Sequence, residues 1–87
     1  MANIKSAMKR ANVIQIRTKR NAAYRSMMKT AIRRFEVALK SGDLEKAREE
    51  LQKALRTIDK IETKGVIHKS TADRKKSRLA KAFNRAS

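Results

Sequence analysis

The fold is decided by residues 5–34, which read KSAMKRANVIQIRTKRNAAYRSMMKTAIRR. This stretch carries ten basic residues and no Asp or Glu, and it contains neither Gly nor Pro. Nothing in it therefore interrupts a continuous helix. Like charges one turn apart destabilise a helix, so we expect this helix to be fully stable only beside a polyanionic partner.

A weak apolar stripe runs along this predicted helix at spacings of mostly three and four residues. It consists of Ala7, Ala11, Ile14, Thr18, Tyr24, Met28, Ile32, Phe35 and Leu39. The first half of the stripe has few or small apolar residues, whereas the second half has the large ones that can pack in a core. We predict a helix over about residues 6–40, with Asn3 or Ser6 as its cap.

Two glycine-containing breaks divide the rest of the chain into two further helices. Gly42 and Gly65 can adopt the left-handed conformation that ends a helix, and Asp43 can cap the helix that follows. The second helix, over about residues 44–63, has a heptad-like stripe made of Leu44, Ala47, Leu51, Ala54, Leu55, Ile58 and Ile61. We predict the third helix over about residues 71–84, with Ser70 as its cap and with Ala72, Leu79, Phe83 and Ala86 facing inward.

Length and composition indicate one all-α domain. The 87 residues include no Pro, two Gly and no alternating run of β-branched residues, so we predict a three-helix bundle spanning residues 1–87. Two short connections make the three helices antiparallel neighbours, and the second and third are much shorter than the first. We therefore expect the N-terminal half of the first helix to overhang without a protein partner.

The net charge of +16 is unevenly distributed along the chain. Residues 1–34 hold ten basic and no acidic residues, residues 35–63 hold six and seven, and residues 64–87 hold eight and one. Two strongly positive ends around a nearly neutral middle are typical of a protein that binds nucleic acid. The chain has only three aromatic residues, too few to stack unpaired bases, which favours phosphate contacts on double-helical nucleic acid.

Catalysis and metal binding are not expected from this composition. The chain has one His and no Cys, and its two glycines are too far apart to form a phosphate loop, so we predict no catalytic residue, metal site, cofactor or small-molecule substrate. No apolar run has the length of a membrane span or a signal peptide, and we expect a cytoplasmic location. His68 has two interpretations: a loop histidine bonded to backbone, or a side chain that helps Lys69 to meet phosphate.

Several strings in the chain are distinctive in combination. They are Asn3-Ile4-Lys5-Ser6-Ala7 with Lys9-Arg10, then Arg20-Asn21, Arg25-Ser26-Met27-Met28-Lys29-Thr30, the Gly42-Asp43 break, and Lys64-Gly65-Val66-Ile67-His68-Lys69 followed by Ala72 and Arg74-Lys75. Together they resemble the S-twenty family of bacterial small-subunit ribosomal proteins. The resemblance implies a three-helix bundle with an extended first helix, present as a monomer in the small ribosomal subunit. It also implies contacts with the 5′ domain of the small-subunit rRNA and with the long penultimate helix near its 3′ end.

The resemblance further implies a set of RNA-binding residues: Asn3, Lys5, Ser6, Lys9, Arg10, Arg20, Asn21, Arg25, Lys29, His68, Lys69, Arg74 and Lys75. Arg17, Lys64 and Arg78 join this set because they add positive charge to the same segments. An alternative is a histone-like or architectural DNA-binding protein, which the charge and helices alone would suit equally well. A membrane-surface protein would need a broad apolar face with aromatic anchors, which the first helix lacks.

Overall fold

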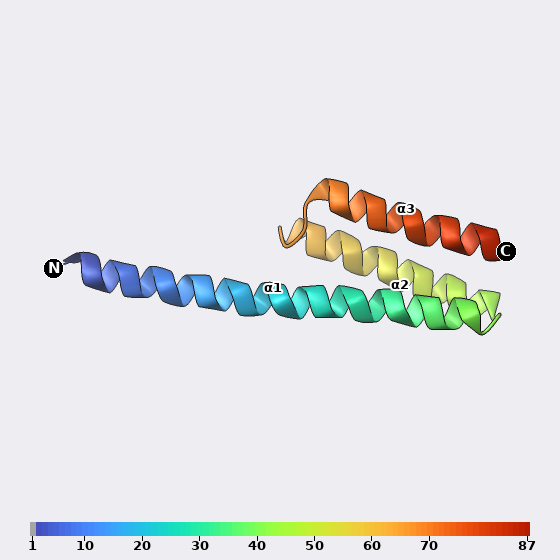
Figure 1. The fold of residues 1–87 in the computed structure, drawn as a ribbon, viewed down its shortest axis with the longest axis horizontal. Helices are drawn as coiled ribbons and strands as arrows, with labels where there is room; N and C mark the ends of the chain where they lie inside the picture. The colour runs from blue at the N-terminus through green and yellow to red at the C-terminus, as the bar shows by residue number, and fades with distance from the viewer. Residues whose placement is uncertain (1) are drawn as a thin grey trace.

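Three helices make up the computed structural model, which describes the backbone of residues 2–87 and the side chains of residues 7–87. They are α1 (Ala2–Lys40), α2 (Leu44–Thr63) and α3 (Lys69–Ala86). Figure 1 shows α2 and α3 lying along the C-terminal half of α1, while the N-terminal half projects beyond them. The Cα atoms extend over 64 × 21 × 13 Å. The all-α fold with a long first helix is therefore confirmed.

The ends of α1 and α3 differ from those predicted. α1 begins at Ala2, so Asn3 and Ser6 lie inside the helix and do not cap it. The reason is that residues 2–6 contain no Gly or Pro to stop the helix from extending. α3 begins at Lys69, and its N-cap is His68. The prediction that Ser70 caps α3 was wrong.

Both glycine breaks have the conformation that the sequence predicts. Gly42 has φ 82° and Gly65 has φ 75°, values in the left-handed region where a Cβ atom would be strained. The Asp43 side chain caps α2 by accepting a hydrogen bond from the Lys46 backbone N–H, at 3.2 Å. These local signals fix where the chain reverses, and so fix how much of α1 the shorter helices can cover.

The apolar core lies between α2 and the C-terminal half of α1 and is closed by α3 and the segment before it. Phe35, Ile58 and Ile61 are fully buried, and Val66 packs into the same cluster from the segment between α2 and α3. The other buried members are Met28, Ala54, Ala72 and Leu79, with Leu51 and Phe83 partly buried beside them. The predicted stripes therefore identify most of the core.

Two of the inward-facing positions predicted for the second and third helices are exposed. Leu44 is 39% exposed and Ala86 is also exposed, and both lie at the ends of their helices. Met27 is 45% exposed although Met28 is buried, since adjacent residues on a helix point about 100° apart. Whether an apolar residue is buried therefore depends on its position on the helix and not only on its apolar character.

α3 packs chiefly against α2 and touches α1 only slightly, and Figure 1 shows α2 between the other two helices. The Lys76 ammonium of α3 lies 2.7 Å from the Asp59 carboxylate of α2 and 3.8 Å from that of Asp73. The hydrogen bond with Asp59 raises the pKa of Lys76, and the negative charges of Asp59, Asp73 and Glu62 add to this effect. Lys76 therefore joins α2 to α3.

Phe35→Ala should destabilise the chain by about 3–5 kcal/mol, because it removes a large, fully buried side chain and leaves a cavity. That loss approaches the whole stability expected of so small a domain. Val37→Ala is the matched control, since Val37 is on the same helix but 61% exposed. Thermal melts followed by circular dichroism measure both. Equal melting temperatures for Phe35→Ala and the parent would contradict the core described above.

Candidate nucleic-acid interface

The N-terminal half of α1 forms an overhang, defined here as residues 7–20, in which every residue is exposed. Even the large apolar side chains there are open to solvent: Met8 is 63% exposed, Ile14 62% and Ile16 66%. These side chains lie on different sides of the helix, so the overhang has no single apolar face. Met8 is exposed because neither α2 nor α3 extends along this part of α1 (Figure 1).

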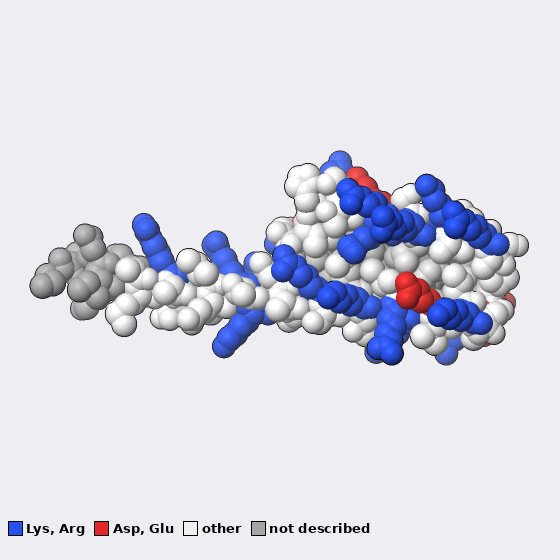
Figure 2. Space-filling model, viewed as in Figure 1, with Lys and Arg blue, Asp and Glu red and all other residues white. Residues whose placement is uncertain are grey.

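Basic side chains project from opposite sides of the overhang. Arg17 and Lys19 are two residues apart and therefore point about 200° apart around the helix. Figure 2 shows Lys and Arg side chains leaving both edges of the projecting helix, with no acidic side chain visible between them. An isolated helix with this arrangement presents positive charge to partners on more than one side.

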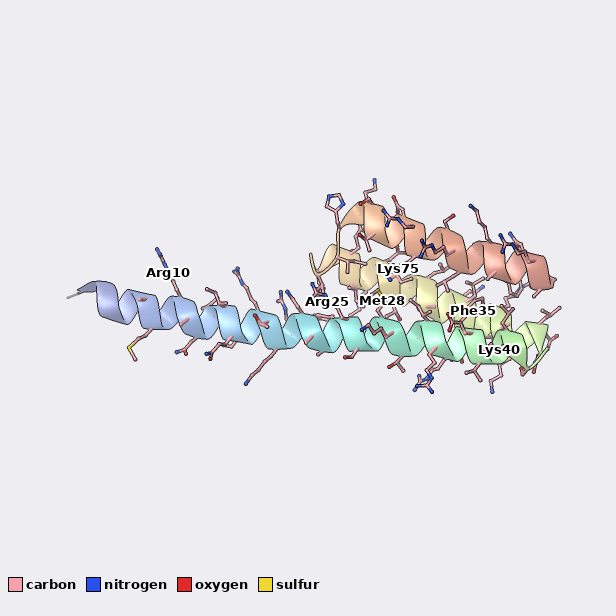
Figure 3. All side chains as sticks on the ribbon, in the orientation of Figure 1. Arg10, Arg25, Met28, Phe35, Lys40 and Lys75 are labelled. Atoms are coloured by element: carbon pink, nitrogen blue, oxygen red, sulfur yellow. The ribbon has the colours of Figure 1, made fainter. Side chains whose placement is uncertain are left out.

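The segment between α2 and α3, called the connector here (residues 64–68), meets α1 where the overhang begins. Val66 and Ile67 pack into the same apolar cluster as Tyr24 and Met28, and Figure 1 shows the connector beside the middle of α1. Arg10, Arg17 and Tyr24 are seven residues apart, so they share one face of the helix. Since Tyr24 packs on the core, Arg10 and Arg17 continue the face that α2 and α3 cover further along. Figure 3 shows Arg10 projecting on that side.

This arrangement produces a step, with the overhang as its floor and the connector as its wall. The floor carries Arg10 and Arg17, and the wall carries Lys64 and His68, with Lys69 next to it at the start of α3. All of these residues are exposed. Positive groups on two surfaces that meet at an angle can contact a polyanion from two directions. The sequence indicated these residues separately, and the fold places Arg10 and Arg17 on the face of α1 that leads to the connector.

His68 has a defined structural role at this wall. Its Nδ1 accepts a hydrogen bond from the Ser70 backbone N–H at 3.1 Å and lies 2.9 Å from the Ser70 hydroxyl. Because Nδ1 accepts, the neutral ring carries its proton on Nε2. The side chain is exposed, so the backbone-bonded interpretation of His68 is the one observed, and Nε2–H remains a donor for a ligand.

The basic run at the start of α3 divides into two kinds of residue. Arg74 and Arg78 are exposed and Lys75, labelled in Figure 3, is partly buried. The ammonium group of Lys76 instead forms ion pairs with the carboxylates of Asp59 and Asp73. Arg74, Lys75 and Arg78 were predicted to bind RNA, and Lys76 was not. Lys76 is an exception because the rotation of α3 places it against α2.

The remaining predicted contacts fall into three groups. Lys9, Arg20, Arg25 and Lys29 are exposed along α1. Asn21 is partly buried, and its Oδ1 lacks a hydrogen-bond partner among residues 7–87, so the amide nitrogen is the end that can donate to a phosphate. The side chains of Asn3, Lys5 and Ser6 lie outside the described residues. Lys19 was not among the predicted contacts, but it is exposed on the overhang between Arg17 and Arg20, far along the sequence from any acidic residue.

Within the described residues, no group of three or more His, Cys, Asp or Glu side chains is placed to hold a metal ion. Over the same part of the chain, no helix combines the length and apolar character needed to cross a membrane. The two remaining aromatic residues besides Tyr24 also pack on the core. The exposed chemistry of the step is thus that of Lys, Arg, His and amide groups.

Comparison with known proteins identifies related chains. The family model described as ribosomal protein S20 matches residues 2–84. A protein of Heliobacterium modesticaldum is 54% identical over 86 residues, covering 99% of this chain and 98% of its own. One of Carboxydothermus hydrogenoformans is 60% identical over 84 residues, covering 97% and 90%. One of Pelotomaculum thermopropionicum is 56% identical over 85 residues, covering 98% and 97%. All three relatives are named small ribosomal subunit protein bS20.

Proposed function

Because the chain belongs to the ribosomal protein S20 family, we propose that its overhang and connector bind folded rRNA of the small ribosomal subunit, of which it is a structural constituent. The observation that carries this proposal is the overhang itself. Fourteen consecutive helical residues have no protein partner among the described residues, and five of them are Lys or Arg. A helix of this charge is stabilised by phosphates, which neutralise the repulsion along it.

The proposed mechanism is recognition of RNA shape through its backbone. Lys and Arg on the floor and wall of the step contact phosphates, while His68 Nε2–H and the Asn21 amide can donate to phosphate or ribose oxygens. All three aromatic side chains pack on the apolar core, so they offer no platform on which unpaired bases could stack. These contacts position double-helical RNA and involve no catalytic step.

We further propose that the chain acts as one domain and one copy that contacts two rRNA segments, the 5′ domain and the long penultimate helix near the 3′ end. Support comes from the placement of charge on opposite sides of the overhang, as with Arg17 and Lys19. One RNA segment can lie in the step, against Arg10, Arg17 and the connector. A second segment can then lie against the opposite side of the same helix.

Binding to an rRNA 5′-domain fragment, measured by fluorescence anisotropy, tests the proposed function. Arg10→Ala/Arg17→Ala should weaken binding by at least about tenfold, since each removes a charge-assisted contact. Lys40→Ala/Arg48→Ala is the matched control, because both residues are exposed and lie near the turn between α1 and α2, away from the step, and it should bind nearly as the parent does. Equal losses for the two double variants would refute the step as the binding site.

Duplex DNA of the same length separates the proposal from the architectural DNA-binding alternative. Binding to the rRNA fragment should be at least about tenfold tighter, because A-form geometry and 2′-hydroxyl groups distinguish RNA from DNA. If the chain binds both equally tightly, only a general affinity for polyanions would remain, and the DNA-binding alternative would be favoured.

A further inference from the structure

A groove runs between α1 and α2 on a face that α3 does not cover. Two hollows of about 620 and 520 Å³ share Thr30, Arg34 and Glu50, and every residue that lines them belongs to α1, α2 or the turn between these helices. Thr57 lines the groove, whereas Asp59 holds α3 through Lys76. Side chains two residues apart on a helix point about 200° apart, so the groove and α3 lie on opposite sides of α2.

The floor of this groove is apolar and open. It consists of Met27, Ala31, Val37 and Ala38, all of which belong to α1, and Thr30 and Arg34 of the same helix line the groove among them. Met27 is 45% exposed and Val37 is 61% exposed. Along α2 the groove extends from Lys46 to Thr57, which is about 16 Å at the rise of an α-helix. That length matches about three turns of a second helix laid into it.

The charged rim of the groove is mostly basic, and Thr30, Ser41 and Thr57 also line the groove. The basic part of the rim is formed by Arg33, Arg34, Lys46, Lys53 and Arg56. Glu50 is the one acidic residue lining the two hollows; its side chain is only 15% exposed and its carboxylate lies 3.8 Å from the Lys53 ammonium. An occupant therefore meets an apolar strip bordered by positive charge.

We propose that this groove docks an acidic amphipathic helix of another protein. Such a helix would place apolar residues at i, i+3, i+4 and i+7 on the Val37 and Met27 strip, and carboxylates on both flanks against the basic rim. Duplex RNA suits the groove less well, since its outer surface is phosphate and sugar and has nothing apolar to cover Val37 and Met27. The groove is lined by α1 residues from Met27 onward, whereas the overhang ends at residue 20, so the helix and rRNA can bind to different parts of the molecule.

The test uses the full chain and a designed probe at about 0.15 M salt, where non-specific attraction between exposed charges is screened. The probe is a labelled helical peptide of about 14 residues, with Leu at the four apolar positions and Glu on both flanks. A second peptide has Gln in place of each Leu and the same charge. We expect the Leu peptide to bind, and the Gln peptide to bind at least about tenfold more weakly. Equal binding of the two peptides would overturn the proposal, because charge alone would then explain it.

Two matched variants locate the site. Val37→Ser should weaken binding of the Leu peptide by about tenfold, whereas Val13→Ser should not change it, since Val13 is exposed on the overhang. Amide NMR shifts should concentrate at Thr30, Val37 and Thr57. The proposal is overturned if the two variants bind equally well. It is also overturned if a charge-matched RNA duplex shifts the same amides, because the groove would then be an RNA surface.

Discussion

The affinity of the chain for an rRNA 5′-domain fragment should fall by about 10³- to 10⁵-fold between 50 and 200 mM salt, if six to ten phosphates are neutralised. Twelve of the sixteen predicted contact residues are Lys or Arg, so the chain has enough basic residues to neutralise six to ten phosphates. Each neutralised phosphate releases condensed counterions, and the free energy of that release shrinks as the salt concentration rises. A plot of log affinity against log salt should have a slope of about −0.9 per phosphate on double-helical RNA.

A variant that lacks two basic side chains provides a comparison for this measurement. Arg10→Ala/Arg17→Ala removes two exposed cations from the floor of the step and should make the slope less steep by about 1.8. The control Lys40→Ala/Arg48→Ala should leave the slope unchanged. A nearly flat plot for the parent chain would contradict an electrostatic mechanism, whatever the affinity at one salt concentration.

The parts of the fold that depend on local chemistry could be predicted from the sequence. Gly42 and Gly65 allow the left-handed backbone that ends a helix, and Asp43 supplies the acceptor that begins the next one. Once these breaks are fixed, helix lengths alone require an overhang, because no later helix is long enough to cover α1. The exposure of the floor of the step therefore follows from counting residues.

The parts that depend on how helices rotate against each other could not be predicted. Lys76 has the same spacing and neighbours as Lys75, and only the packing of α3 on α2 brings it to Asp59. The groove formed by residues as distant as Val37 and Lys53 likewise has no signal in either helix alone. His68 replaced Ser70 as the cap because an imidazole nitrogen can accept a backbone N–H as a hydroxyl does, a possibility that capping preferences rank low.

Amides of residues 8–22 should exchange with solvent almost unprotected in the free chain, while amides of residues 51–58 should be strongly protected. Residues 51–58 include Ala54 and Ile58, which are fully buried, whereas every residue from 8 to 20 is exposed. Helices gain most of their stability from packing, and opening free energies range from near zero at unsupported ends to the global value in a core. Repulsion between Lys9, Arg10, Arg17, Lys19 and Arg20 adds to the difference.

Addition of the rRNA fragment should remove this difference in amide protection. The free and RNA-bound chains then serve as each other's control. Phosphates remove the repulsion and give the overhang a partner, so residues 8–22 should become protected while residues 51–58 change little. Ordering these residues costs backbone entropy of about 1–2 kcal/mol each, and this cost reduces the net affinity below what the charge contacts alone would give. Equal protection of the two regions in the free chain would show that the overhang is stable by itself, and coupled folding would then be ruled out.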